Sequence, residues 1–115
     1  MLFYRLRFFS ILEKNFRTRK GEVDLIVRRG GLLVFVEVKA RQQDVAGAGF
    51  EAVDRVKQLK IVSAAEEYLH KSPWKPELIR FDVISLHWDS RRFMIQHFPS
   101  AFECGFEIGR PWRAR

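Results

Sequence analysis

Two apolar runs rich in β-branched residues lie on either side of a glycine pair in the first third of the chain. They cover residues 22–29 and 32–39, and Gly30-Gly31 stands between them. Because glycine tolerates the positive φ angle of a tight turn, this pattern predicts an antiparallel β-hairpin. A loop of either two or four residues places Arg29 opposite Leu32, and the same register then holds along both strands.

Four charged side chains interrupt the apolar pattern of this hairpin. In the predicted register Asp24 faces Glu37, and Glu22 faces Lys39. Strand side chains alternate between faces, so all four are expected on one side, with facing Cβ atoms about 4.5–5.5 Å apart. Like charges opposite each other destabilise a sheet, so this arrangement favours a bound divalent metal with oxygen ligands.

An ordinary solvated strand face is the alternative interpretation of the same four residues. In that case Glu22 and Lys39 form a cross-strand ion pair, and no metal is needed. Residues 34–38 are otherwise so apolar that this strand is expected to be covered on both faces. Charges in a covered strand are costly unless they have a partner or a purpose, which favours the functional interpretation.

The remaining pattern predicts one longer helix and three more strands. Residues 1–8 are compatible with either a helix or the start of a strand. Residues 40–50 hold two glycines among polar side chains, which predicts a loop beside the acidic cluster. Two prolines within residues 72–76 predict a break. The expected elements are strands at 9–17, 78–86 and 92–98 and a helix at 52–70.

The expected helix has an apolar stripe that should pack on the sheet. With 100° between successive residues, the stripe contains Ile61, Ala64, Ala65 and Tyr68. Asp54, Lys57 and Gln58 continue the same stripe toward the helix start, at the end nearest the loop that follows the acidic hairpin. These polar groups either reach into the acidic cluster or lie in solvent at a frayed first turn, and the pattern leaves both open.

Length and charge favour one domain with a polyanionic partner. The chain has 115 residues, which suits a single domain, expected over residues 1–102, followed by a flexible basic tail over 103–115. Lys and Arg number 21 against 14 Asp and Glu, which gives a net charge of +7. This imbalance favours a nucleic acid, most simply DNA, as the partner. Oligomeric state stays open, and a homodimer is compatible with the sequence.

The single cysteine and the hydropathy pattern indicate the cell compartment in which the protein works. Cys104 stands alone, so an internal disulfide and a multi-cysteine zinc site are excluded. No apolar run approaches the roughly 18 residues of a membrane-spanning helix. The apolar start of the chain is interrupted by Arg5 and Arg7 and lacks a clean signal-peptide core. We therefore expect a cytoplasmic protein without a membrane partner.

The spacing of the acidic residues resembles a known nuclease motif. Asp24, then twelve residues, then Glu37-Val38-Lys39 resembles the PD-(D/E)xK core of many restriction endonucleases and archaeal-type Holliday junction resolvases. The runs at residues 21–26 and 35–39 look still more like the YraN family of endonuclease-like bacterial proteins. That similarity extends from about Ile11 through residues 80–83 to Phe102. It implies an α/β, restriction-endonuclease-like core, with a mixed central sheet, a β-hairpin that carries the acidic motif and a flanking helix.

The resemblance also implies roles for individual residues in a metal-dependent endonuclease that hydrolyses DNA, with branched or damaged DNA as candidate substrates. Asp24 and Glu37 would hold Mg²⁺ or Mn²⁺, and Glu22 would complete or tune the metal shell. Lys39 would orient the attacking water and offset charge that develops on the phosphate. Gln58, on the helix after the motif, would assist. Cations expected to contact the nucleic-acid backbone are Arg17, Arg19, Lys20, Arg41 and Lys57.

One departure from the family pattern keeps a second function in view. YraN-like proteins usually carry a longer first helix with an additional glutamate at the metal site. Either that helix is shortened here, or its acidic role passes to Glu22. The alternative is therefore a non-catalytic nucleic-acid-binding module that keeps the fold. A third interpretation, a protein-interaction scaffold, is suggested only by the 14% aromatic content.

Overall fold

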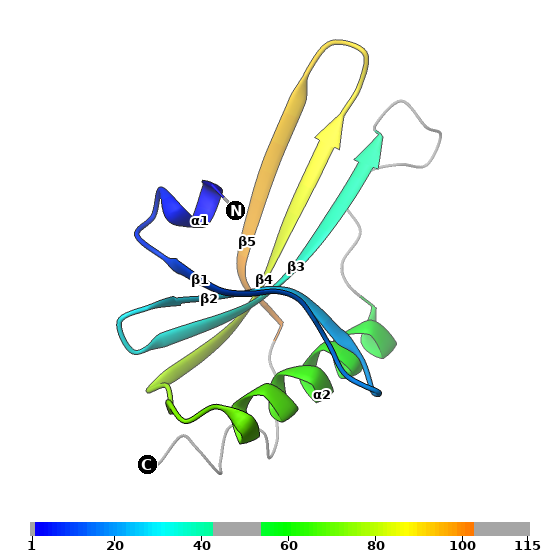
Figure 1. The fold of residues 1–115 in the computed structure, drawn as a ribbon. Coiled ribbons are helices and arrows are strands. Elements are labelled where there is room, and N and C mark those ends of the chain that lie inside the picture. The colour runs from blue at the N-terminus through cyan, green and yellow to red at the C-terminus, as the bar shows by residue number, and fades with distance from the viewer. Residues whose placement is uncertain (1, 43–53, 103–115) are drawn as a thin grey trace.

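A computed structural model describes residues 2–42 and 54–102, with the side chain of Arg41 excepted. Five strands form one sheet in the order β1-β2-β3-β4-β5. All neighbours are antiparallel except β3 and β4, which run parallel, so the predicted mixed sheet is confirmed. The elements are α1 (Leu2–Arg5), β1 (Ser10–Arg17), β2 (Glu22–Arg29), β3 (Leu32–Gln42), α2 (Arg55–Lys71), β4 (Leu78–Trp88) and β5 (Phe93–Phe102) (Figure 1).

The predicted hairpin is formed by β2 and β3. Its ladder runs from Arg29 opposite Leu32 to Leu25 opposite Val36, in the predicted register. Gly30 in the turn has a φ of 60°, a left-handed conformation that glycine adopts without steric cost. The hairpin strand β3 is the central strand of the sheet, which gives its residues a fixed position between two layers.

Both faces of β3 are covered, as its apolar run predicted. Leu33 and Phe35 lie in the core between the sheet and α2, together with Ile61 and Ala65. On the opposite face Val34 and Val36 pack in a second cluster that includes Tyr4 and Phe9. Those last two residues come from α1 and from the segment just before β1. The α2 layer and the α1 layer therefore enclose the strand that carries the acidic motif.

Helix α2 connects the parallel strands β3 and β4 and runs along one face of the sheet (Figure 1). Asp54 is its N-cap, and the Asp54 carboxylate accepts a 2.8 Å hydrogen bond from the Lys57 backbone N–H. The predicted stripe is confirmed for its three buried members and is completed by a half-buried Tyr68. Val62 and Leu69 are also buried, which the stripe did not include. The full buried set is Ile61, Val62, Ala64, Ala65 and Leu69.

A glycine allows β2 and α2 to approach each other closely. A Cβ atom built on Gly21 would collide with the backbone carbonyl oxygen of Lys60. Any larger residue at this position would push the first half of α2 away from the start of β2. Gly21 therefore helps to place the helix beside the carboxylates of the hairpin.

Several boundaries differ from the sequence-based expectation. Strand β3 continues to Gln42, although a loop was expected from residue 40, because its parallel pairing with β4 extends to Trp88. The first helix is only Leu2–Arg5, and a turn follows it through Phe8. The expected strands 78–86 and 92–98 are each longer in the structure.

Two expected features lie outside the described residues. They are the part of the loop beyond Gln42, at 43–50, and the basic tail at 103–115. In the described part of the chain, neither helix combines the length and the apolar character needed to cross a membrane.

Candidate active site

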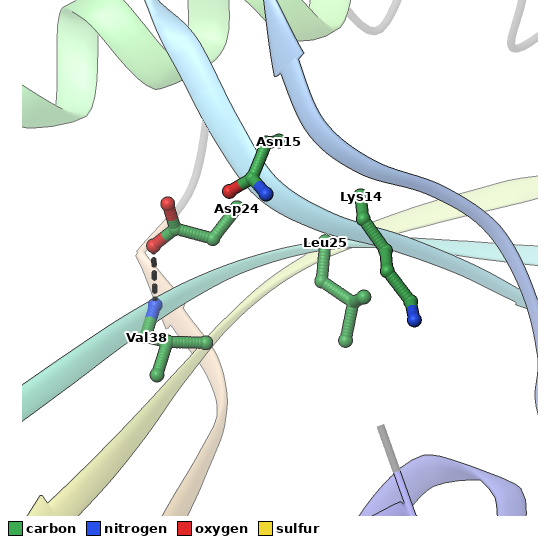
Figure 2. Close-up of a pocket in the computed structure, with 5 residues that line it drawn as sticks. All are labelled: Lys14, Asn15, Asp24, Leu25 and Val38. Carbon is green, nitrogen blue, oxygen red and sulfur yellow. Dashed lines mark hydrogen bonds between the residues drawn. The ribbon is translucent and has the colours of Figure 1, made fainter.

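Asp24 connects the two strands of the acidic hairpin. It lies on β2, where its backbone is one residue beyond the last pair of the β2–β3 ladder. Its Oδ2 accepts a 2.8 Å hydrogen bond from the backbone N–H of Val38 on β3 (Figure 2). Because Val38 stands between Glu37 and Lys39, this bond holds the Asp24 carboxylate at the acidic motif.

Glu37 is the most buried acid of the hairpin, with 6% of its surface exposed. Its Oε1 is buried and has no hydrogen-bond partner among the described residues. Burial raises the pKa of Glu37 to about 7, and the nearby negative charge of Asp24 adds to this rise, whereas Lys57 opposes it. An unpaired oxygen on a buried carboxylate is costly, so this group would gain from a further cation.

Lys57 on the first turn of α2 reaches the acidic residues. Its Nζ lies 3.3 Å from Oε2 of Glu37. The charge of Glu37 raises the pKa of the Lys57 ammonium, and the charges of Asp24 and Glu22 add to this effect. Lys57 thus contacts Glu37 and lies within electrostatic range of Asp24 and Glu22. The sequence left two positions open for Lys57, and in the structure its ammonium contacts Glu37 from a partly exposed side chain; Gln58 beside it is half-buried.

Glu22 lies at the outer end of the cluster. It forms a 3.6 Å ion pair with Nε of Arg17 on β1; the Arg17 side chain is largely exposed and that of Glu22 is half-buried. The β2–β3 ladder ends at Leu25 and Val36, so the predicted pairing of Glu22 with Lys39 stays a prediction. Lys39 is half-buried on β3, and its backbone lies beside Ser85 of β4.

Two carboxylates of the site, those of Asp24 and Glu37, are suitable protein ligands for a divalent metal. Among residues 2–42 and 54–102, no three side chains of His, Cys, Asp or Glu are placed to hold a metal ion together. Mg²⁺ in phosphate-handling sites is commonly bound by one or two carboxylates, with waters and substrate oxygens in the other positions. Asp24 and Glu37 supply such a pair. The unpartnered Oε1 of Glu37 is the observation that favours a cation at this place.

An open hollow of about 470 Å³ lies on the surface beside Asp24. Its walls come from three adjacent strands and include two polar residues of β1 that sequence reasoning missed. Asn15 is one of them and has a φ of 54°, which is uncommon for a residue other than glycine. The only sequence signal for this conformation is that Asn tolerates it better than most residues. The lining residues are Lys14, Asn15, Asp24, Leu25 and Val38 (Figure 2).

The other cations predicted to bind nucleic acid differ in how exposed they are and in whether they are already paired. Arg19 and Lys20 are exposed in the turn between β1 and β2. Arg17 is exposed on β1 and paired with Glu22, as described above. Arg41 lies on β3 with its backbone beside His87, and its side chain lies outside what the structure describes. Arg19 and Lys20 are thus the predicted cations in this set that are most open to a large anion.

A second polar cluster lies on the opposite face of the sheet, and both oxygens of its central carboxylate already have hydrogen-bond partners. Asp82 of β4 is fully buried and accepts hydrogen bonds of 2.8 and 2.9 Å from the Arg80 guanidinium. His97 Nε2 lies 2.8 Å away, and the Tyr4 hydroxyl and the Ser100 N–H also donate to this carboxylate. These partners come from α1, β4 and β5, so Asp82 ties these elements together.

The fold and the site define a small α/β protein with a mixed five-stranded sheet and an acidic cluster on its central hairpin. The chain belongs to the Uncharacterised protein family UPF0102, whose family model matches residues 1–86. The matched region contains Asp24, Glu37, Lys39 and the whole of α2. The expected membership in the YraN family is thereby confirmed, since UPF0102 is that family.

Relatives in three bacteria show the same membership. A UPF0102 protein of Anaeromyxobacter dehalogenans is 40% identical over 97 residues, which cover 84% of this chain and 72% of the relative. One of Geobacter metallireducens is 42% identical over 98 residues, covering 85% and 80%. One of Hahella chejuensis is 42% identical over 102 residues, covering 89% and 82%. The similarity thus spans most of each protein.

Proposed function

We propose that this protein is a metal-dependent nuclease that hydrolyses phosphodiester bonds in DNA, with a core of the PD-(D/E)xK type. One observation carries the proposal. The Asp24 carboxylate is fixed to the Val38 N–H beside Glu37, and a buried oxygen of Glu37 lacks a partner. Two adjacent carboxylates, one of them with an oxygen that has no hydrogen-bond partner, are suitable ligands for a catalytic Mg²⁺ or Mn²⁺.

The acidic residues would hold the ion. Asp24 and Glu37 are its direct ligands in this proposal, and Glu22 tunes the charge around it. When bound, the ion supplies Lewis-acid chemistry to the phosphate and lowers the pKa of water. Glu37 is buried, so the surrounding packing restricts the positions that its carboxylate can take.

Three side chains near the carboxylates support the reaction in this proposal. Lys39 follows Glu37 by two residues on β3, so alternation places both on one face, where the Lys39 ammonium orients the attacking water. Lys57 favours the ionised form of Glu37 through their 3.3 Å contact. Gln58 donates to the substrate from the same helix turn. Arg17, Arg19, Lys20 and Arg41 contact the DNA backbone, which is consistent with the net charge of +7.

A non-catalytic nucleic-acid-binding module is the second candidate, and one observation favours it. The Lys57 ammonium already lies beside Glu37 and provides an internal cation. If this ion pair replaces the metal, the fold binds DNA without cutting it. The two candidates differ in whether divalent metal is taken up at Asp24 and Glu37.

A cleavage assay separates them. Branched and linear DNA are incubated with the protein in Mg²⁺, in Mn²⁺ and in EDTA. The nuclease proposal requires products that depend on metal and are lost in Asp24→Asn and in Glu37→Gln. Glu67→Gln, a matched change at the far end of α2 where Glu67 pairs with Lys71, should leave cleavage unchanged. Binding without products under all conditions would contradict the nuclease and support the module.

A further inference from the structure

The two oxygens of the Glu37 carboxylate have different surroundings. Oε2 lies 3.3 Å from the Lys57 ammonium, whereas Oε1 is buried and has no hydrogen-bond partner among the described residues. The Asp24 carboxylate is also close enough to act on the pKa of Glu37, which it raises. The Lys57 ammonium can compensate the charge of one of these two acids, but not of both.

The partners of the ion pair between Lys57 and Glu37 differ in how freely they can move. The side chain of Glu37 is 8% exposed, and that of Lys57 is 46% exposed. Glu37 lies on the central strand β3, whose two faces are covered by the two apolar clusters. Lys57 instead carries its charge at the end of a flexible aliphatic stem. If the pair separates, Lys57 is therefore the residue that moves.

The backbone of Lys57 is held in place independently of its ammonium. Its N–H donates a 2.8 Å hydrogen bond to Oδ1 of Asp54, the N-cap of α2. The close approach of Gly21 to the Lys60 carbonyl fixes the same part of the helix beside the start of β2. A swing of the Lys57 side chain therefore requires no shift of α2, and the ammonium stays tethered near the acids.

A divalent cation and the Lys57 ammonium would compete for one carboxylate. A metal ion bound by Glu37 brings two positive charges next to the ammonium on the same group, and like charges at such short range repel strongly. The charges of Asp24 and Glu22 favour the Lys57 ammonium at this place, and they favour a dication more. Lys57 can avoid the repulsion by turning into solvent.

We propose that Lys57 is the exchangeable counter-ion of Glu37: it neutralises this carboxylate in the metal-free protein, is displaced by a divalent metal, and so sets the metal affinity of the site. The inference rests on the proposed function, because it requires a metal at Asp24 and Glu37. Lys57 acts through Glu37, so it is a positioning residue and not a catalytic one.

Titration with Mg²⁺ in the absence of nucleic acid is the first measurement. It is run at about pH 9, because the pKa of Glu37 is raised to about 7 and the carboxylate must be ionised. Lys57→Gln should bind Mg²⁺ about tenfold more tightly than the wild type, a coupling of ordinary size. Lys57→Arg keeps the charge and should match the wild type. Lys71→Gln removes an equal charge at the far end of α2 and should also match it.

Thermal unfolding supplies a second measurement, which a purely structural ion pair would not satisfy. In EDTA at the same pH, Lys57→Gln leaves the buried Glu37 carboxylate without its partner and should melt at a lower temperature than the wild type. At saturating Mg²⁺ this difference should disappear, because the metal has already displaced the ammonium in the wild type. A structural ion pair predicts the same deficit with and without Mg²⁺.

Two results would overturn the inference alone. The first is a Lys57→Gln variant that binds Mg²⁺ no more tightly than the wild type or Lys71→Gln. The second is a melting deficit that persists at saturating Mg²⁺. Absence of Mg²⁺ binding in both the wild type and Lys57→Gln would overturn the inference together with the nuclease. Tighter binding by Lys57→Gln in a protein that never cleaves DNA would support the inference and contradict the nuclease, so the two proposals fail separately.

Discussion

The Asp24 carboxylate accepts a 2.8 Å hydrogen bond from the Val38 N–H, across the two strands of the central hairpin. This contact makes the position of one acid depend on the strand that carries the other, Glu37. It also explains how two carboxylates remain adjacent despite their repulsion. The backbone dipole of Val38 stabilises the charge on Asp24, while Lys57 stabilises the charge on Glu37.

The raised pKa of Glu37 predicts a pH-dependent stability. Burial raises this pKa from 4.5 to about 7, so the folded state binds the proton more tightly than the unfolded state. The contribution of Glu37 is therefore fully present below about pH 4.5 and is lost as pH rises through about 7. In metal-free solution, Glu37→Gln should flatten this decline between those two pH values. Urea unfolding at a series of pH values measures it, and an unchanged profile would contradict the assignment.

Lys39→Ala should suppress cleavage while leaving metal binding largely intact. A protonated ammonium cannot ligate a cation, so its removal takes away no metal ligand. Isothermal titration with Mg²⁺ and a cleavage assay are run on the same preparation. Loss of Mg²⁺ affinity in a folded variant would show that Lys39 organises the carboxylates rather than the water.

Asp82→Asn should behave as a structural change. Asp82 is buried and hydrogen-bonded to His97, and its charge is paired with the Arg80 guanidinium, so removal of this charge leaves Arg80 without its counter-ion. Breaking such a buried pair costs about 3–5 kcal/mol. Urea unfolding should show this loss equally in EDTA and in Mg²⁺. A loss that appears only with metal would instead place Asp82 in the metal site.

Much of the fold follows from short-range patterns. Gly30 marks the turn, the register follows from it, and the apolar stripe of α2 identifies its buried face, because turn chemistry and helical periodicity are local. The extension of β3 to Gln42 was missed because it depends on pairing with β4, which lies far along the chain. Long-range pairing leaves no local signal in one strand.

The site was predicted only in part, for a similar reason. Hairpin alternation brings the acids together, but the bond from the Val38 N–H to Asp24 and the left-handed conformation of Asn15 are backbone features that the pattern of side chains does not encode. The contact between Lys57 and Glu37 depends on how α2 packs on the sheet, which the sequence left open. Backbone geometry and helix placement were the missing information.

Thermal unfolding of Asp24→Asn with and without Mg²⁺ tests the central claim, a metal site at Asp24 and Glu37, most directly. Asparagine keeps an oxygen for the Val38 N–H and removes one of two repelling charges. In EDTA the variant should be as stable as the wild type or more stable, by about 0.2–1 kcal/mol. With Mg²⁺ the wild type should gain RT ln(1 + [L]/Kd) and the variant much less, and Glu37→Gln should repeat this pattern. A loss of several kcal/mol in Asp24→Asn, the same with and without Mg²⁺, would show that Asp24 is a structural hydrogen-bond acceptor and would contradict the metal site.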